Sequence, residues 1–249
     1  MSTRAAFDRG ARHYDLMVAL NPGYHAHLRR AAASLVDTLR GQPGPWRLLD
    51  LACGSGASTR ALVDAAPPDT HIQGLDASPG MLSRARAKHW PASVTFAEAT
   101  AGSLDTQAWQ PGTHHGILSA YLVRNLTPAQ RRDALAEIQA LLTPGGTLTV
   151  VEYSVRERFR AQLVWSIVSW LVIIPLGALL DRNPSLYTYL WRSVMEFDTP
   201  TQFMKQLHTA GFVDIATRSV PGWQHGILHL YMARKPPATA CRIPYAPAA

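Results

Sequence analysis

The sequence predicts an α/β fold, with a mostly parallel sheet and helices on both of its faces. Two observations predict it. From Trp46 onward short apolar runs alternate with stretches at helical spacing, and the first of these runs ends in a glycine-rich turn. Short strands separated by helices of this length form parallel sheets through right-handed crossovers. The expected strands cover 47–52, 71–76, 93–98, 115–121 and 147–153, and the expected helices cover 57–66, 79–89 and 128–142.

The regions on either side of this alternation complete the expected domain. Apolar residues from Leu28 to Leu39 recur at helical spacing before a Gly/Pro breaker, so the first 40 residues are expected to be helical and to cap the sheet. After a long insertion, the chain is expected to form a helix at 200–209 and strands at 213–220 and 227–234. We therefore expect a single domain over 1–235, interrupted by an apolar helical lid at about 155–198, and a flexible Pro- and Ala-rich tail at 236–249.

A tight Gly-X-Gly turn, at Gly54 and Gly56, follows the first expected strand. Because glycine has no Cβ, the backbone of such a turn can approach a nucleotide-like ligand closely. The second expected strand ends in Asp76, at the distance where doubly wound folds place an acid that binds ribose hydroxyls. A dinucleotide fingerprint would need a glycine at Thr59, and a phosphate-binding loop would need a lysine at Ala57. The pattern therefore predicts an adenosine-containing cofactor that needs no pyrophosphate cradle.

The composition limits the kinds of binding partner but does not identify one of them. The 249-residue chain is 47% hydrophobic and carries a formal net charge of +7, which suits an anionic membrane, nucleic acid or acidic substrates. The basic residues are dispersed, so no nucleic-acid partner is expected. Cys53, Cys241 and the adjacent histidines at 114 and 115 give no usable ligand spacing, so no metal is expected. The N-terminus has no apolar core of signal-peptide length, and we expect a cytoplasmic protein.

Residues 163–180 form an uncharged segment of eighteen residues. A membrane span needs about 20 residues, and a proline and a glycine interrupt this segment. It holds two tryptophans and follows three arginines, as segments that rest in a membrane interface do. Three interpretations stay open: a helical lid packed over the site, the same lid in peripheral contact with the inner face of a membrane, and a true span.

Several strings together carry a family resemblance. They are the Asp50-x-x-x-Gly54-x-Gly56 turn, the strings at 74–82 and 121–126, the Pro-Gly-Gly turn and strand at 142–154, and shorter matches at 187–190 and 210–212. Over about residues 7–235 the chain resembles the class I S-adenosylmethionine (SAM) methyltransferases, and among them the ubiquinone/menaquinone C-methyltransferase family. The resemblance implies a Rossmann-like class I methyltransferase fold with seven strands and a helical lid inserted after the fifth strand.

The resemblance also implies SAM as cofactor and a set of residues to hold it. Asp76 would bind the ribose diol and Met81 would lie against the adenine. Where the family carries Gly-Asp-Ala after the third strand, this chain has Thr100-Ala101, so an uncharged hydroxyl replaces the carboxylate that meets the adenine amine. The implied cofactor residues are Asp50, Ala52, Cys53, Gly54, Gly56, Asp76, Ala77, Met81, Thr100, Ala101 and Tyr121.

Methyl transfer from a sulfonium to a ring carbon requires the protein to align the acceptor and to exclude water. The carbon of a reduced quinol becomes nucleophilic when a neighbouring hydroxyl loses its proton, so a base, or a water held by one, is expected. By resemblance, Arg124 and Asn125 orient that water and stabilise the developing phenolate, while Tyr14 and Tyr121 shape the pocket. For Arg124 the alternative is a salt bridge that stiffens the end of the fourth strand.

Four further residues are candidate contacts of the acceptor. His25 and His225 are possible bases, because imidazole titrates near neutrality, and a solvated or core role is the alternative for each. Tyr187 and Tyr189 either line a channel for an isoprenoid tail or pack the lid onto the sheet. The two interpretations of these tyrosines stay open.

The leading prediction is a SAM-dependent enzyme that C-methylates a hydrophobic prenylated quinol, similar to demethylmenaquinol. C- or O-methylation of another aromatic or polyketide small molecule is the alternative, because Thr100 and the segment 21–25 depart from the family pattern. A nucleic-acid or protein binder and a cofactor-binding module without activity are less favoured alternatives. A homodimer is left open.

Overall fold

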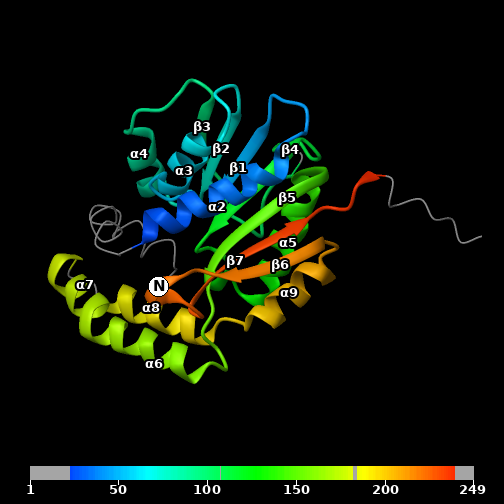
Figure 1. Cartoon of the computed structure of the whole chain (residues 1–249). Coiled ribbons are helices and arrows are strands. Elements are labelled where there is room, and N and C mark those ends of the chain that lie inside the picture. The colour runs from blue at the N-terminus through cyan, green and yellow to red at the C-terminus, as the bar shows by residue number, and fades with distance from the viewer. Residues whose placement is uncertain (1–22, 107, 182–183, 239–249) are drawn as a thin grey trace, which may run out of the picture.

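The computed structural model describes residues 23–106, 108–181 and 184–238. At its centre is a seven-stranded sheet in the order β3-β2-β1-β4-β5-β7-β6 (Figure 1). The strands are β1 (Arg47–Leu51), β2 (His71–Asp76), β3 (Val94–Glu98), β4 (His114–Ala120), β5 (Leu142–Tyr153), β6 (Val213–Ser219) and β7 (Leu228–Arg234). Strands β1 to β5 run parallel, and β7 lies antiparallel to both β5 and β6. The predicted mostly parallel α/β sheet is confirmed.

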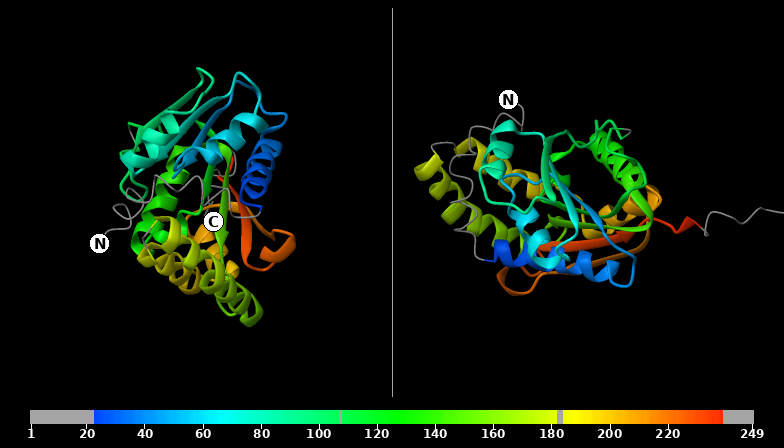
Figure 2. Two further views of the ribbon diagram at one scale, coloured as in Figure 1. Left: turned by 90° about the vertical axis from the view of Figure 1, so that its left-hand side faces the viewer. Right: turned by 90° about the horizontal axis from the view of Figure 1, so that it is seen from above.

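Helices cover both faces of the sheet, with one apolar core under each layer. Helices α2 (Tyr24–Leu39) and α3 (Ala57–Ala65) pack on one core, and α5 (Pro128–Leu141) and α9 (Pro200–Thr209) pack on the other (Figure 2). Helix α4 (Pro79–Arg86) packs beside β2 and β3. The buried stripe of α2 follows the predicted spacing: Leu28, Ala31, Ala32, Leu35, Val36 and Leu39.

Local sequence explains where several helices begin. In α5 and α9 a threonine N-cap and a glutamine three residues later satisfy each other's backbone amides, and proline occupies the first helical position. Ser78 caps α4 by accepting from the amide of Met81. Helix α4 ends at Arg86, three residues before the predicted boundary, and the indole of Trp90 donates to the Ala85 carbonyl at 2.7 Å beside that end.

Strand β5 begins at Leu142, five residues before the predicted strand. Leu142 pairs with His114, and regular pairing resumes only at Gly116 and Thr147, so the Pro-Gly-Gly turn forms an irregularity within the strand. A pattern of alternating residues does not reveal such an interruption, because the turn residues break the alternation between Leu142 and Thr147.

The segment between β5 and α9 forms a helical layer at one end of the sheet. Helix α6 (Phe159–Val168), a π-helical turn η2 (Ser169–Ile173) and α7 (Ile174–Asp181) run as one continuous helix along the outside. Helix α8 (Pro184–Glu196) lies between that helix and the body of the protein (Figure 1). These helices occupy the segment predicted as a lid, while the first 22 residues and 239–249, which include most of the predicted tail, lie outside the described residues.

Candidate active site

The turn after β1 presents open backbone at the carboxyl edge of the sheet. Gly54 and Gly56 have φ values of +54° and +91°, a region that other residues enter only with strain. A Cβ on Gly54 would meet no atom within 4 Å, whereas a Cβ on Gly56 would lie 2.8 Å from the ring of Trp90. Gly54 therefore leaves room for a ligand, and Gly56 makes room for the protein's own indole.

The Asp76 carboxylate joins this turn to the end of β2. Its Oδ2 accepts from the amide of Gly54 at 2.8 Å, and its Oδ1 accepts from the amide of Ser78 at 2.8 Å. Strands β1 and β2 are parallel neighbours, so their carboxyl ends meet at the same edge. The glycine turn and the distant acid, which the sequence linked only by spacing, are in direct contact.

Asp50 lies beneath the turn and is completely buried. Its Oδ2 accepts from the hydroxyls of Ser58 at 2.8 Å and Thr59 at 2.5 Å, while its Oδ1 has no hydrogen-bond partner among the described residues. Burial raises the pKa of this carboxyl from 3.8 to about 7. A buried carboxylate oxygen without a partner fits a site that receives a cationic or hydrogen-bond-donating group.

Replacing Asp50 by asparagine is expected to stabilise the unliganded protein in a pH-dependent way. Because the folded pKa of about 7 exceeds the unfolded value of 3.8, the wild type loses stability as pH rises through that window, and the variant does not. Urea unfolding should show a gain of about 4 kcal/mol at pH 8 and little change at pH 4. The exposed Asp64→Asn on α3 is the matched control, and an equal effect at both pH values would contradict the buried-charge explanation.

The other predicted cofactor residues follow β1, β2 and β3 at the same edge. Cys53 is buried, its amide donates to the Leu75 carbonyl at 2.9 Å, and burial raises the pKa of its thiol. Ala52 has a φ of +65°, unusual for a residue with a Cβ. The remaining positions differ in exposure: Met81 and Ala101 are buried, Ala77 is half-buried and Thr100 is exposed.

Beside the glycine turn, the chain leaves β4 through a strained tyrosine. Tyr121 has a φ of +60°, and its carbonyl accepts from Arg124 Nη1 at 3.1 Å and from Asn125 Nδ2 at 2.9 Å. A left-handed conformation costs a non-glycine residue about 1–2 kcal/mol, and these two hydrogen bonds help to offset it. The 3₁₀ turn η1 (Val123–Asn125) is thereby fixed at the end of β4.

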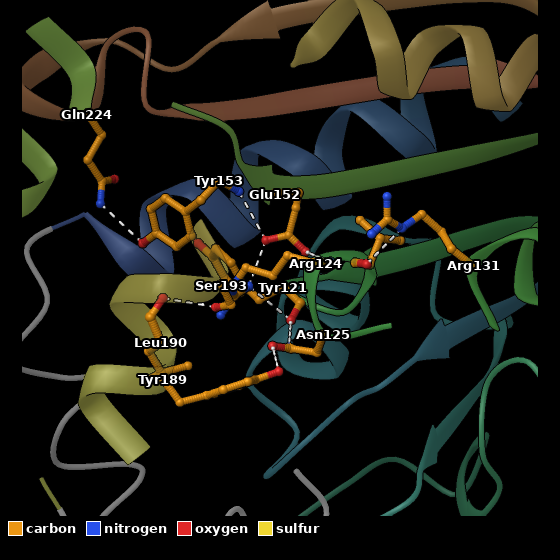
Figure 3. Close-up of polar contacts among 11 residues, drawn as sticks. Tyr121, Arg124, Asn125, Arg131, Glu152, Tyr153, Tyr189, Leu190, Ser193 and Gln224 are labelled. Carbon is orange, nitrogen blue, oxygen red and sulfur yellow. Dashed lines mark hydrogen bonds and ion pairs between the residues drawn. The ribbon is translucent and has the colours of Figure 1, made fainter. Parts of the chain in front are cut away.

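Arg124 forms a buried ion pair with Glu152 on β5. Its Nη1 lies 2.6 Å from Oε1 of Glu152, and its amide donates to Oε2 at 3.2 Å (Figure 3). The two side chains are 7% and 0% exposed, so the pair is withdrawn from solvent. The pair agrees with the alternative prediction for Arg124, a salt bridge at the end of the fourth strand. Arg124 and Asn125 both donate to the Tyr121 carbonyl, so the ion-paired guanidinium helps to fix the backbone that carries Asn125.

The two lid tyrosines have different surroundings. Tyr189, on α8, donates its hydroxyl to Oδ1 of Asn125 at 3.3 Å, so the lid reaches the end of β4 (Figure 3). Tyr187 is buried within the lid, where a Cβ on Gly177 would lie 2.2 Å from its ring. Tyr187 thus packs the lid helices together, and Tyr189 connects the lid to the candidate site.

The predicted histidines lie at the periphery. His25 is exposed on the first turn of α2, with its ring edge-on to Tyr24 at 5.6 Å. His225 is exposed just after η3 (Gly222–Gln224). Tyr14 lies outside the described residues. Their assignment to the acceptor stays a prediction.

Sequence reasoning missed an aromatic stack that borders η1. The ring of Tyr121 lies 5.1 Å from that of Tyr24 and 5.3 Å from that of Tyr153, and Tyr153 lies 4.9 Å from Trp165 of α6. Gln224 donates to the Tyr153 hydroxyl at 3.3 Å (Figure 3). The position of Tyr153 in the sequence could have identified it as a site residue. Tyr153 ends β5 as Asp76 ends β2, and ligands of parallel sheets bind at the carboxyl ends of the strands.

This fold defines the class of protein. A seven-stranded sheet in this order, with helices on both faces, is the Rossmann-like fold of class I methyltransferases, and the candidate site lies at its carboxyl edge. The chain belongs to the ubiE/COQ5 methyltransferase family, whose model matches residues 2–235. It is therefore a methyltransferase enzyme, as the sequence resemblance predicted.

Three similar proteins illustrate the relationship. The chain is 31% identical over 214 residues to the ubiquinone/menaquinone biosynthesis C-methyltransferase UbiE of Methylobacterium nodulans, covering 85% of this chain and 83% of that protein. It is 32% identical over 209 residues to the demethylmenaquinone methyltransferase of Thermus thermophilus, covering 83% and 90%. Haemonchus contortus phosphoethanolamine N-methyltransferase 2, solved with S-adenosyl-L-methionine, superimposes with a TM-score of 0.64 at 15% identity, covering 95% of this chain and 60% of that one.

Proposed function

We propose that this enzyme transfers the methyl group of SAM to a ring carbon of a reduced, prenylated quinol similar to demethylmenaquinol. The proposal rests mainly on the position of two features at one edge of the sheet. The glycine turn follows β1 and the aromatic stack follows β4, which are parallel neighbours, and Tyr189 of the apolar lid contacts Asn125 at the end of β4. A flat, hydrophobic acceptor suits such surroundings. The names of the two bacterial relatives, a C-methyltransferase of quinone biosynthesis and a demethylmenaquinone methyltransferase, support the same acceptor class.

SAM fits the residues present at the carboxyl edge. The Asp76 carboxylate would accept from the ribose hydroxyls, the open face of Gly54 would admit the methionine part, and the unpartnered oxygen of Asp50 suits its ammonium group or a water bound to it. Met81 and Ala101 offer apolar surface to the adenine. When bound, SAM supplies an electrophilic methyl group that needs no activation by the protein.

The protein's own task is to orient the acceptor and receive its proton. We assign Asn125 to contact with the acceptor hydroxyl, directly or through the water that takes the proton, and Arg124 to positioning of the Tyr121 carbonyl and Asn125. Tyr121 and Tyr14 are proposed to shape the acceptor pocket, and His25 and His225 are proposed as further contacts of the acceptor. Catalysis of this kind depends mainly on alignment and exclusion of water. We propose that the enzyme acts at the cytoplasmic face of a membrane, in which a prenylated quinol is dissolved.

Tyr189→Phe is expected to lower turnover without unfolding the protein. The change removes only the hydroxyl that donates to Asn125, and one neutral hydrogen bond contributes about 1 kcal/mol, or about fivefold. Steady-state kinetics with a prenylated quinol should show that loss, while thermal unfolding stays near wild type. In a cycle with Asn125→Ala the two effects should not add, and full additivity would contradict coupling between the lid and the site.

The acceptor class is tested by competition between two groups of compounds. Purified enzyme with SAM should methylate demethylmenaquinol-type prenylated quinols and leave soluble catechols and simple phenols largely unmodified. Methylation of the soluble compounds alone would favour the other small-molecule function. Calorimetric titration with SAM provides the control, because a protein that does not bind the cofactor would overturn every methyltransferase mechanism at this site.

A further inference from the structure

The continuous lid helix exposes an apolar stripe to solvent along its whole length. Among the described residues, Phe159–Leu179 is the one helix long and apolar enough to cross a membrane, and an 18-residue window within it has a mean hydropathy of 1.9. Only 17% of that window is buried. At a rise of about 1.5 Å per residue the stripe is about 30 Å long. Its exposed side chains are Phe159, Leu163, Val164, Ile167, Trp170, Leu171, Val172 and Leu179.

The opposite side of the same helix packs against the rest of the protein. Ala161, Trp165, Ser169 and Ile174 are buried, at the spacing of one helix face. The indole of Trp165 donates to the Trp191 carbonyl on α8 at 3.3 Å. A helix that crosses a bilayer must present apolar surface to lipid all around or pack on other spanning segments. This helix can present one face only, which favours a position parallel to the membrane plane over a span.

Positive charge accompanies the stripe where it begins. Arg156, Arg158 and Arg160 are all exposed within five residues, with only Glu157 of opposite sign among them. Arg192 is exposed on the neighbouring α8, and the whole chain carries +7. Basic residues near an anionic bilayer contribute about 1 kcal/mol each, and a second copy of the chain would bring the same positive charge to the interface. The charge therefore favours anionic lipid over self-association.

We propose that this lid face, defined as the exposed side chains of Phe159–Leu179 together with Arg156 and Arg158, docks in the plane of an anionic phospholipid bilayer. The biological reason for this docking rests on the proposed function, because docking would place the site beside an acceptor dissolved in lipid. The docking itself does not depend on that function. Contacts run inward from the docked helix: Trp165 lies 4.9 Å from Tyr153, and Tyr153 lies 5.3 Å from Tyr121. The helix that meets the membrane thus also forms one wall of the aromatic stack.

Co-sedimentation with vesicles tests the docking without requiring turnover. The probes are phosphatidylcholine vesicles with and without phosphatidylglycerol, and wild type should bind the anionic vesicles more tightly. Leu171→Asp and Leu179→Asp change side chains that are 73% and 76% exposed, so the fold should persist. Each is expected to weaken binding to anionic vesicles by about tenfold or more. Val213→Asp, an exposed apolar position on β6, is the matched control and should bind as wild type does.

Three outcomes would overturn the proposal. One is equal binding by wild type and both lid variants. Another is resistance of the bound protein to alkaline carbonate washing, which indicates a span. The third is a wild-type protein that forms a dimer and does not bind vesicles, together with a Leu171→Asp variant that is monomeric. That result would identify the lid face as a self-association surface. Because sedimentation and methylation are measured separately, a protein that binds vesicles but methylates no quinol would contradict the proposed function and leave the docking intact.

Discussion

Asp76→Ala is expected to weaken SAM binding by about 100-fold or more, because it removes a carboxylate placed to accept from both ribose hydroxyls. The same change also deprives the amides of Gly54 and Ser78 of their acceptor, so the turn that faces the cofactor loses its tie to β2. Calorimetric titration measures the affinity, and methyl transfer at saturating quinol should fall in parallel when SAM is kept below its dissociation constant.

Asp69→Ala is the matched control for Asp76→Ala. Asp69 precedes β2 at its amino end, on the opposite edge of the sheet from the glycine turn, and is exposed. Its replacement should leave SAM affinity within about twofold of wild type, as for most exposed substitutions away from a site. Comparable losses in the two variants would indicate a general effect of negative charge and would remove Asp76 from the proposed cofactor site.

Glu152→Gln is expected to destabilise the protein by about 3 kcal/mol, because it leaves the buried guanidinium of Arg124 without its counter-charge. Glu152 is fully buried and accepts from Arg124 and from the amide of Tyr153. The loss should also displace the Tyr121 carbonyl and Asn125, so turnover falls more than the population of folded protein does. Chemical unfolding and steady-state kinetics at a temperature where the variant is folded measure the two effects separately.

The double variant Arg124→Gln, Glu152→Gln separates stability from catalysis. Replacing both charges by amides removes the uncompensated ion while keeping groups that can hydrogen-bond, so much of the lost stability should return. Turnover should remain low, because the new pair no longer holds Tyr121 and Asn125 as the guanidinium does. Recovery of turnover together with stability would show that Arg124 contributes to the fold alone.

The sheet and the glycine turn could be predicted because their signals are local. Strand β1, the turn at Gly54 and the acid at Asp76 lie within thirty residues, and parallel pairing brings strand ends together without further information. The family resemblance supplied the remaining expectation, that residues after β4 meet an acceptor.

What the sequence could not supply depends on contacts between distant segments. Glu152 lies 28 positions from Arg124, and Tyr189 lies 64 positions from Asn125. No periodicity indicates which buried acid meets which base, or which of two nearby lid tyrosines turns toward the site. The apolar run at 163–180 was evident, but only packing shows that one side is buried against α8 and the other is exposed.

The central claim, SAM-dependent methylation at a quinol carbon, is tested most directly with a carbon-13-labelled methyl donor. The purified enzyme is incubated with labelled SAM and a prenylated demethylnaphthoquinol in mixed vesicles, and the product is studied by mass spectrometry and carbon-13 nuclear magnetic resonance. We predict one added methyl group with the chemical shift of an aromatic C-methyl, and much less of this product from the Asp76→Ala control when labelled SAM is limiting. A labelled methoxy resonance, or no label in any prenylated quinol despite SAM binding, would contradict the claim.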